Sequence, residues 1–373
     1  MTDVRIVEAG MRRDMRRLFN LPSRLYRDDP NYVEPLRAEL TKQFDRKKNA
    51  FFTHGDIQPY LALRRGRVVG GIIAVHNELY NQYHGDRTGF FMSFECENDP
   101  EAAGSLFEAV EGWLRKRGLD TVVGPMSFSG ENLSPGLQIS GFEHPPFLLM
   151  AHHLPYYRLL VEGAGYGKAI DSLAFRMPIQ QEMDPRLVRL VELVGRTRNI
   201  TVRALDRKHF WRDAKTLFDI YKRAWADNWG FVPPSQEDFL DIVKSLKQIY
   251  IRELVLIAEK EGQPVGWAMT LPNINEALIH MKGRLLPFGL FKFLYWMKRI
   301  KGLRLWGLGI VPEYRGRGVD AMLYYHTLKE GKRLGYTDGE LSWILETNAP
   351  VVNAAHLVKG TEYKRYRIYR KAL

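Results

Sequence analysis

A turn rich in glycine and arginine, residues 315–318 near the end of the chain, carries the residue types that bind phosphate groups. Arg315 and Arg317 alternate with Gly316 and Gly318. Glycine lets the backbone approach an anion closely, and arginine adds a permanent positive charge. An apolar run that predicts a strand precedes the turn, and apolar residues at helical spacing follow it. The stretch therefore predicts a phosphate-binding loop at a helix start, and the alternative is a surface turn with solvated arginines.

The spacing of the glycines excludes two common phosphate-binding motifs. The third glycine of a dinucleotide fingerprint is missing, and so is the Gly-Lys-Ser/Thr ending of a P-loop. The stretch resembles motif A of the GNAT acyltransferase superfamily, R/Q-x-x-G-x-G/A, although an aspartate stands where its last glycine or alanine is usual, and an alternative register begins at Tyr314. In that family the loop holds the pyrophosphate of acyl-coenzyme A. The resemblance implies that this co-substrate is bound by Arg315, Gly316, Arg317, Gly318, Val319 and Asp320.

The same resemblance implies where the acyl-transfer chemistry takes place. In GNAT enzymes the strand before the loop supplies backbone donors, which points to Gly309, Ile310 and Val311. Glu346 follows the next predicted strand and is the candidate general base or amine anchor. Asn348 either holds the coenzyme arm or caps the helix that follows it.

Two residues are candidates for protonating the leaving thiolate. In the family this acid is often a tyrosine four residues before the glycine of a Tyr-x-x-x-Gly-Phe motif, and that place holds His356 here, before Gly360. Histidine exchanges protons near neutral pH, so it can replace the tyrosine, or it is an ordinary residue on a helix surface. Tyr363, in the alternating tail that predicts the last strand, is the second candidate.

The loop 224–233 combines aromatic and carboxylate side chains and forms the predicted acceptor side. Exposed aromatic rings beside one carboxylate suit an amphipathic amine, and the alternative is that the tryptophans pack in the core. The residues concerned are Trp225, Asp227, Asn228 and Trp229. No metal site is predicted, because the chain has one cysteine, Cys96, and the adjacent His152 and His153 cannot both point at one ion from a strand.

The chain repeats itself, and the repeat sets its domain organisation. Three segments recur in the same order at nearly the same offset: 28–35 with 227–234, 62–70 with 258–266, and 153–165 with 348–360. We therefore predict two tandem GNAT-like domains, 1–178 and 200–373. Each is expected to be an α/β (α+β) domain in which helices flank a mixed, twisted sheet.

The two copies differ at the loop. Where the second copy has its glycines and arginines, the first has Glu97, Asp99 and Pro100. Carboxylates repel a pyrophosphate, and proline lacks an N–H donor. The first copy is therefore expected not to bind acyl-CoA in the usual way, and to serve as a structural partner or as a wall of the acceptor site.

The second copy also carries an apolar, aromatic insertion at 284–301. Its central part, 285–297, contains one charged residue, Lys292, and basic residues flank it. This stretch is too short to span a bilayer, but it suits an interfacial helix among anionic headgroups. A lid over a long acyl chain and a helix packed between the domains are the alternatives.

Composition limits the partners. The chain has 373 residues and a net charge of +12, which favours acyl-CoA, an acidic acyl carrier protein or an anionic membrane. Lysine and arginine are spread along the chain without a nucleic-acid-binding signature, so nucleic acid is not expected. Without a transmembrane run or a signal segment, the sequence predicts a cytoplasmic protein with a peripheral contact at the inner membrane.

These features predict an acyl-CoA-dependent N-acyltransferase that is active in the second copy. Some bacterial ceramide synthases are similar to GNAT proteins, and a lipid-like sphingoid amine at the membrane surface would explain the insertion at 284–301. Three alternatives stay open: an N-acetyltransferase for a small soluble amine or peptide, with a buried insertion; a Fem-like aminoacyl transferase; and a non-catalytic module that binds acyl-CoA.

Overall fold

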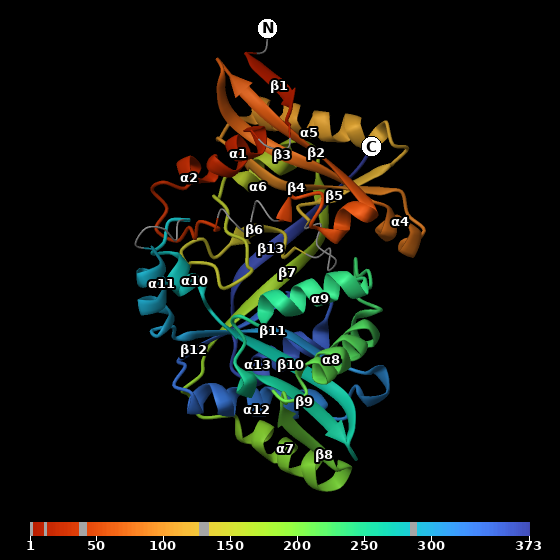
Figure 1. Cartoon of the computed structure of the whole chain (residues 1–373), viewed down its shortest axis with the longest axis vertical. Helices are drawn as coiled ribbons and strands as arrows, with labels where there is room; N and C mark the ends of the chain where they lie inside the picture. The colour runs from red at the N-terminus through yellow and green to blue at the C-terminus, as the bar shows by residue number, and fades with distance from the viewer. Residues whose placement is uncertain (1–2, 11–12, 37–42, 127–133, 284–288) are drawn as a thin grey trace. The chain divides into compact units, whose positions relative to one another are not determined.

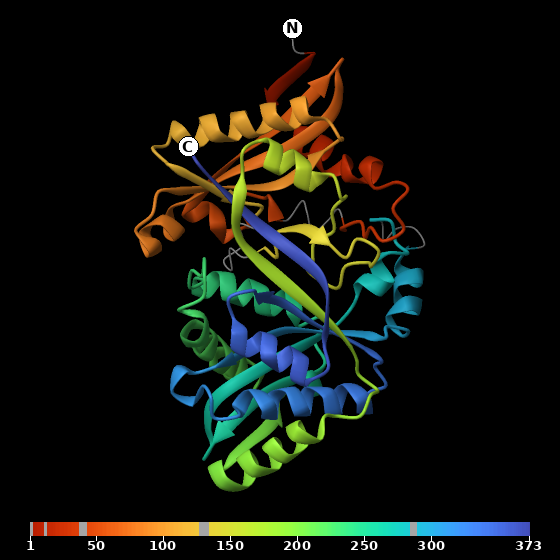
Figure 2. The same cartoon turned by 180° about the vertical axis from the view of Figure 1, so that it is seen from behind.

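The computed structural model describes residues 3–10, 13–36, 43–126, 134–283 and 289–373. The chain divides into two compact units (Figure 1, and from behind in Figure 2). Unit 1 comprises Met1–Ser172, Leu278–Phe293 and Lys364–Leu373, and unit 2 comprises Leu173–Ala277 and Leu294–Tyr363. The last residues of the chain thus belong to unit 1. The domain boundaries expected at 178 and 200 stay a prediction.

Unit 1 is built on a mixed sheet in the order β1-β2-β3-β4-β5-β13, with β6 beside β13. Strands β1 to β4 pair antiparallel, whereas β4 and β5 are parallel. The strands are β1 (Val4–Glu8), β2 (Gly55–Arg64), β3 (Arg67–Asn77), β4 (Thr88–Cys96), β5 (Thr121–Gly124), β6 (Leu137–Ser140) and the C-terminal part of β13 (Thr361–Ala372). The helices are α1 (Arg13–Asn20), α2 (Pro22–Leu25), η1 (Ala50–Thr53), α4 (Glu78–His84), α5 (Pro100–Arg115) and α6 (Tyr157–Gly163).

The start of α5 explains why unit 1 has no phosphate loop after β4. The Asp99 side chain accepts a hydrogen bond from the N–H of Ala102 at 3.1 Å and caps the helix, and Pro100 occupies the first turn. The guanidinium of Arg64 binds Asp99 and Glu101, each at 2.8 Å. The N-terminus of α5 is therefore already capped by a carboxylate of the chain itself. The corresponding place in unit 2 has glycines and arginines.

The part of the sheet that belongs to unit 2 is also mixed, with its strands in the order β7-β12-β11-β10-β9-β8. Helices α8 and α9 lie in front of it in Figure 1, and α12 and α13 lie in front in Figure 2, so helices cover both faces. The strands are β7 (Gly167–Pro178, its later residues), β8 (Ile200–Ala204), β9 (Val255–Lys260), β10 (Gln263–Pro272), β11 (Gly302–Ile310) and β12 (Asp338–Leu345). The helices are α7 (Pro185–Arg198), α8 (Phe210–Trp225), α9 (Gln236–Leu246), η2 (Arg252–Leu254), α10 (Asn275–Leu278), η3 (Pro312–Tyr314), α12 (Val319–Arg333) and α13 (Ala349–Leu357). Helix α11 (Gly289–Met297) belongs to unit 1 as far as Phe293 and to unit 2 from Leu294.

Both units contain a β-bulge in corresponding strand pairs. The β3–β4 register shifts between Gly71 and Ile73, and the β10–β11 register shifts between Met269 and Thr270. A bulge bends its strand and re-aims the residues beyond it. The matching mixed strand arrangements of the two units, each flanked by helices, confirm the predicted tandem α/β class.

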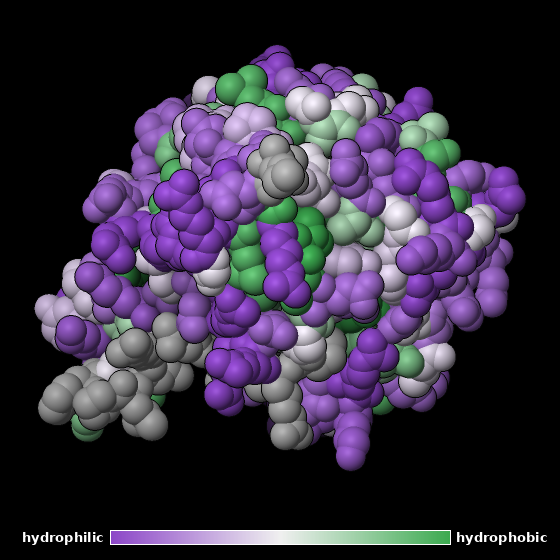
Figure 3. Space-filling view, turned by 90° about the horizontal axis from the view of Figure 1, so that it is seen from above, coloured by the Kyte–Doolittle hydropathy of each residue, from purple (hydrophilic) through white to green (hydrophobic). Residues whose placement is uncertain are grey.

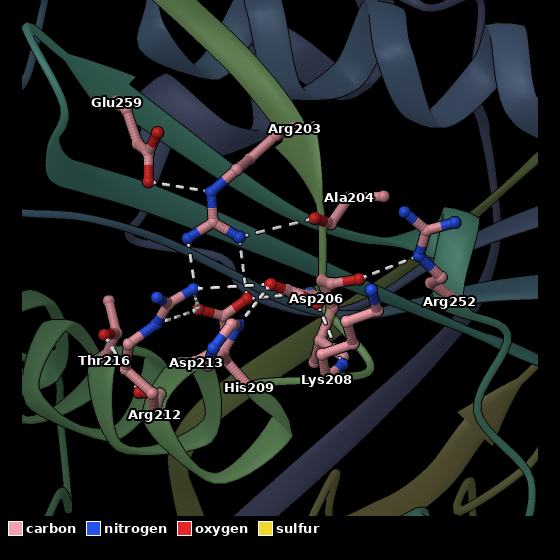
Figure 4. A network of polar contacts seen from close by, with 11 residues as sticks. Arg203, Ala204, Asp206, Lys208, His209, Arg212, Asp213, Thr216, Arg252 and Glu259 are labelled. Carbon is pink, nitrogen blue, oxygen red and sulfur yellow. Dashed lines mark hydrogen bonds and ion pairs between the residues drawn. The ribbon is translucent and has the colours of Figure 1, made fainter.

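A polar network fastens the N-terminal half of α8 to β8 and β9 (Figure 4). Arg203 donates to both oxygens of Asp213, at 2.7 and 3.1 Å, and to Glu259 at 2.8 Å. The N–H of Asp206 also donates to Asp213, at 2.8 Å. Burial acts to raise the pKa of the Asp213 carboxyl, but these donors outweigh it and the pKa is lowered. Asp213 is therefore a buried carboxylate that its partners keep ionised.

We expect Asp213→Asn to lower the free energy of unfolding by about 2 kcal/mol, because it weakens charged hydrogen bonds to Arg203, which is one third exposed. Urea unfolding at pH 7 measures the loss. Since the folded pKa is depressed, the carboxylate's contribution is complete at neutral pH and disappears as the pH falls below about 4. Asp219→Asn, at an exposed pair with Lys222, is the control and should change stability by less than about 0.5 kcal/mol. Equal effects of the two changes would contradict the anchoring role of Asp213.

The face drawn in Figure 3 is mainly hydrophilic and has a small hydrophobic area near its centre. Across the described residues, none of the helices combines the length and the apolar character needed to cross a bilayer.

Candidate active site

Two parallel strands of unit 2 part toward their C-terminal ends. The β11–β12 register runs from Gly302↔Asp338 to Leu305↔Leu341, whereas β11 continues to Ile310 and β12 to Leu345. On its other edge, β11 stays paired with β10 as far as Gly266↔Ile310. Beyond Leu305, the β12 side of β11 therefore opens, within the part of the chain that the structure describes.

The backbone of Ile310 faces this opening. The N–H of Val311 donates to the carbonyl of Val265 at 3.0 Å. Because successive residues of an antiparallel strand alternate in direction, Gly309 turns toward β10 like Val311, and Leu308 and Ile310 turn the other way. Of the three predicted backbone donors, Ile310 is the one placed to serve a ligand between the strands. The backbone of Leu308 faces the same way as that of Ile310. The two-residue period of a strand would have identified Leu308 as a second candidate donor.

The glycine turn leads into a helix whose N-terminus is open. Gly316 and Gly318 have φ values of 66° and 77°, and Gly318 is the N-cap of α12, without a side-chain cap. A Cβ on Gly318 would lie 2.6 Å from Cγ2 of Val194, so both backbone and packing require glycine there. The first N–H groups of α12, starting at Val319 and Asp320, therefore point out of the helix at the positive end of its dipole.

The two arginines of the turn lie in different directions. Arg315 donates from Nη2 to the carbonyl of Ala224 at 2.8 Å, and its Nη1 lies 3.5 Å from Asp227. Arg317 instead lies over the ring of Tyr314, 5.3 Å from its centroid. Arg315 thus connects the loop to the predicted acceptor segment, and Arg317 is the cation that remains for an anionic ligand.

A cavity of about 410 Å³ adjoins the loop on the side of α7 and the β9–β10 turn. Three cations line it, Arg198, Lys260 and Arg317, against one carboxylate, Glu261, and Tyr314 lies between the cations. The remaining lining residues are Thr197, Asn199 and Ile200. A cavity with this charge suits a phosphate-bearing ligand. Arg198 and Lys260 could not be identified from the sequence, because they belong to segments far from the motif.

A buried polar network occupies the rung of β11 and β12 just before the last joined pair, Leu305 and Leu341. Arg304 and Glu340 face each other in register, their side chains are 1% and 0% exposed, and their charged groups lie 3.6 Å apart. Ser342 accepts from Nε of Arg304 at 2.8 Å and donates to Glu340. Tyr363, at the start of β13, donates its hydroxyl hydrogen bond to the other oxygen of Glu340. The network therefore places an oriented tyrosine hydroxyl where the two strands begin to part.

Only Tyr363 of this network was a sequence candidate. Arg304 and Glu340 are charged residues inside otherwise apolar strands, a pattern that signals a buried pair or a functional site. Their partnership could not be predicted, because it depends on the register between two strands that are not neighbours in sequence.

The other residues predicted in this part of the chain lie in the turn after β12 and along α13. Glu346 is half-buried in the turn after β12. Asn348 accepts a hydrogen bond from the N–H of Val351 at 3.4 Å and so caps α13. Capping was the alternative to a coenzyme-binding role for this residue. His356 is exposed in the last turn of α13, with its ring edge-on to Phe175 at 5.2 Å. The roles of Glu346 and His356 stay predictions.

The predicted acceptor residues follow the end of α8. Trp225 stacks on Trp267 with ring centroids 5.7 Å apart, and a Cβ on Gly309 would lie 2.4 Å from its ring. Trp225 therefore packs over β11, while Asp227 is exposed. Asn228 and Trp229 are half-buried in the turn that precedes Phe231.

The fold and the site together define an α/β acyltransferase with two tandem halves. Residues 214–357 match the model of the Acetyltransferase (GNAT) family. "Bacterial ceramide synthase" of Caulobacter vibrioides is 37% identical to this chain, over 100% of this chain and 98% of the relative. "Protein YghO" of Escherichia coli is 34% identical, over 96% of this chain and 93% of the relative. The chain belongs to the GNAT acyltransferase family.

Solved structures agree on the fold. A tandem GNAT protein from the clavulanic acid biosynthesis pathway superimposes with a TM-score of 0.57 at 12% identity, covering 99% of this chain and 98% of that one. A GCN5-related N-acetyltransferase from Sphaerobacter thermophilus gives a TM-score of 0.55 at 14% identity, covering 100% and 96%. At these identities the likeness concerns the fold alone.

Proposed function

We propose that this chain is an acyl-CoA-dependent N-acyltransferase that acylates a long-chain, lipid-like amine at a membrane surface. The observation that carries the donor half of the proposal is the open N-terminus of α12, preceded by Gly316 and Gly318. Such a helix start stabilises an anion through its free N–H groups and its dipole. The parted strands beside it leave room for a linear acyl thioester that hydrogen-bonds to the β11 backbone.

The charges around the loop support a phosphate-rich donor. Arg317 lies at the boundary of the loop and the cavity, and Arg198 and Lys260 add two further cations. Coenzyme A carries several phosphate charges, and each cation at a distance of a few ångströms favours their binding. An acyl carrier protein, which is acidic, is the second donor class that this surface would suit.

The chemistry requires a neutral amine, a stabilised oxyanion and a proton for the leaving thiolate. We assign the oxyanion donor to the N–H of Ile310. Tyr363 would accept the amine proton on Oη while its own proton moves to Glu340, whose orientation Arg304 maintains. The C–N bond forms as the C–S bond breaks, and the proton returns through Tyr363 to the thiolate sulfur.

The acceptor half of the proposal depends on α11. No described residue of this helix is buried, and Leu290, Phe291, Leu294 and Tyr295 are 46 to 72% exposed. Lys292 and Arg299 accompany these apolar side chains. Large exposed apolar residues with flanking cations are typical of helices that bind an anionic bilayer. Residues 284–288 of the insertion lie outside the described residues.

The Caulobacter relative supports the same acceptor class. It is named a ceramide synthase, and a ceramide is an N-acylated long-chain amino alcohol. A membrane-bound amine with a long alkyl chain would explain why α11 exposes its apolar residues. The rival acceptor, a small soluble amine, would not explain why this helix exposes its apolar residues.

We expect the double change Phe291→Glu and Leu294→Glu to weaken binding to phosphatidylglycerol vesicles at least about 10-fold, because it replaces two inserting apolar groups with charges. Vesicle co-sedimentation measures this loss, and unfolding should be unaffected because both positions are exposed. Leu193→Glu on α7, at a leucine that is 58% exposed, is the matched control. Unchanged vesicle binding by the double variant would remove the membrane part of the proposal.

Thermal unfolding with ligands tests the donor assignment. Free CoA and palmitoyl-CoA at 100 times their dissociation constants should each stabilise the folded protein by about 2.7 kcal/mol. Arg317→Glu should remove most of this gain, because it reverses the charge beside the open helix start. Absence of stabilisation by any CoA species would contradict the CoA assignment and would favour acyl carrier protein as the donor.

A further inference from the structure

A carboxylate without a basic partner lies near the end of β4 in unit 1. Among the described residues, Glu95 forms no ion pair, whereas the acidic residues that follow it are paired: Glu97 with Arg24 and Asp99 with Arg64, each at 2.8 Å. A partly buried carboxylate that lacks a cation is costly unless something else compensates it. Glu95 therefore differs from its neighbours in a way that packing alone does not explain.

Two consecutive tyrosines hold the end of β4 in place: Tyr157, the first residue of α6, and Tyr156 just before it. Tyr157, which is fully buried, donates to Oε2 of Glu95 at 2.7 Å and accepts from the N–H of Cys96 at 3.3 Å. Tyr156 donates to the carbonyl of Cys96 at 2.7 Å. The hydroxyl proton of Tyr157 is therefore directed at the carboxylate, and that of Tyr156 is directed away from it.

Two further tyrosines complete the surroundings of Glu95. The rings of Tyr26 and Tyr32 stack, with centroids 4.2 Å apart and planes 13° apart, and Tyr26 lies 6.4 Å from Tyr157. Tyr26 is 2% exposed, and its Oη makes no hydrogen bond of standard geometry, although it is near enough to Glu95 to lower the pKa of that carboxyl. A buried hydroxyl that makes no hydrogen bond of standard geometry can accept one from a ligand beside the carboxylate.

Burial raises the pKa of Glu95 to about 7, against the opposing effect of the Tyr157 and Tyr26 hydroxyls. Burial and the nearby Glu95 charge raise the pKa values of all four tyrosines and, with neighbouring carboxylates, that of the Cys96 thiol. The four tyrosines and the Cys96 thiol are therefore neutral between pH 6 and 9, and Glu95 is the group of this cluster whose pKa lies in that range.

We propose that Glu95 and the tyrosines around it bind a primary ammonium group. Such a cation has three N–H donors, which match the Glu95 carboxylate and the Tyr26 hydroxyl oxygen. The ring faces of Tyr32 and Tyr156 add cation–π attraction. Glu95, Tyr32 and Tyr156 are partly exposed, so a ligand can reach the site over buried Tyr26 and Tyr157.

Unit 2 cannot hold the same group at the corresponding place. Gly71 pairs with Glu95 in unit 1, as Trp267 pairs with Gly309 in unit 2. The ring of Trp225 covers Gly309 so closely that a Cβ would be 2.4 Å away. The ammonium site is thus a property of the half that lacks the phosphate loop. That the bound amine is also the acyl acceptor rests on the function proposed above.

Isothermal titration calorimetry with hexylamine at pH 8, without any acyl donor, tests this site. Glu95→Gln keeps an acceptor for Tyr157 and removes the charge, and it should weaken hexylamine binding at least 10-fold. Tyr26→Phe should weaken it about 3-fold. Glu97→Gln, two residues along the strand and outside the tyrosine cluster, should leave it unchanged. Hexanol, which has no charge, should bind wild type and Glu95→Gln alike.

A proton measurement separates binding from a structural role. At pH 6.5 the wild type should release a proton from Glu95 on binding hexylamine, so the heat should depend on the buffer's ionisation enthalpy, and this dependence should vanish at pH 8.5 and in Glu95→Gln. Folded Glu95→Gln that binds hexylamine as tightly as wild type would overturn the inference and leave the acyltransferase proposal intact. Glu95-dependent hexylamine binding in a protein that transfers no acyl group would support the ammonium site and contradict the acyltransferase proposal.

Discussion

The Tyr363→Phe variant is expected to lose at least about 100-fold in kcat, with a much smaller change in the affinity for the acyl donor. The variant keeps the ring but removes the hydroxyl that donates to Glu340, so the amine proton loses its path. Glu340→Gln should cost a similar factor, because an amide cannot accept the proton that Tyr363 passes on. Release of the free thiol from the acyl donor, followed with a thiol reagent, measures kcat directly.

Combining the two changes shows whether the residues act together. If Tyr363 and Glu340 form one proton path, Tyr363→Phe in the Glu340→Gln background should cost little more than either change alone. Tyr325→Phe, on α12 in the same unit, is the control for loss of a tyrosine hydroxyl. Single variants that fold normally and keep kcat within about 3-fold of wild type would show that the network is only structural.

The Gly318→Val variant should bind the acyl donor at least about 100-fold more weakly. A β-branched residue is strained at a φ of 77°, and its Cβ would lie 2.6 Å from Val194, so the turn must move away from the start of α12. The phosphate groups then lose the N–H donors that the helix start provides. Equilibrium titration with CoA measures the loss.

Backbone strain alone must be separated from damage to the loop. Gly66 has a φ of 78° in the β2–β3 turn of unit 1, and a Cβ there would meet no atom within 4 Å. Gly66→Val therefore imposes comparable strain at a place without a proposed ligand, and it should leave CoA affinity unchanged. Equal losses in Gly66→Val and Gly318→Val would show that global destabilisation, and not the loop, explains the result.

Local signals made most of the fold predictable. The alternating apolar hairpins, the glycine turn and the helical spacing after it appear in the structure as β2–β3, β9–β10 and the β11–α12 junction. The repeat predicted two similar halves, and the matching strand arrangements of the two units agree with it. The assignment of Lys364–Leu373 to unit 1 could not be predicted, because strand partners far apart in sequence leave no local pattern.

The candidate site was predictable only where it is continuous in sequence. Gly318 needs glycine for reasons that a motif can reveal, whereas the pair of Arg304 with Glu340 depends on strand register. The ammonium site around Glu95 depends on residues from three separate segments, and nothing in their spacing indicates it. For His356 the family position suggested an acid, and the structure places it on the exposed side of α13.

The most direct test of the central claim is the complete reaction. Purified protein would be incubated with palmitoyl-CoA and sphinganine in phosphatidylglycerol vesicles, and the products identified by mass spectrometry. We expect N-palmitoyl sphinganine with an equal amount of free CoA, and neither product with Gly318→Val. Transfer to a soluble amine but not to sphinganine, or no thiol release with any amine, would contradict it.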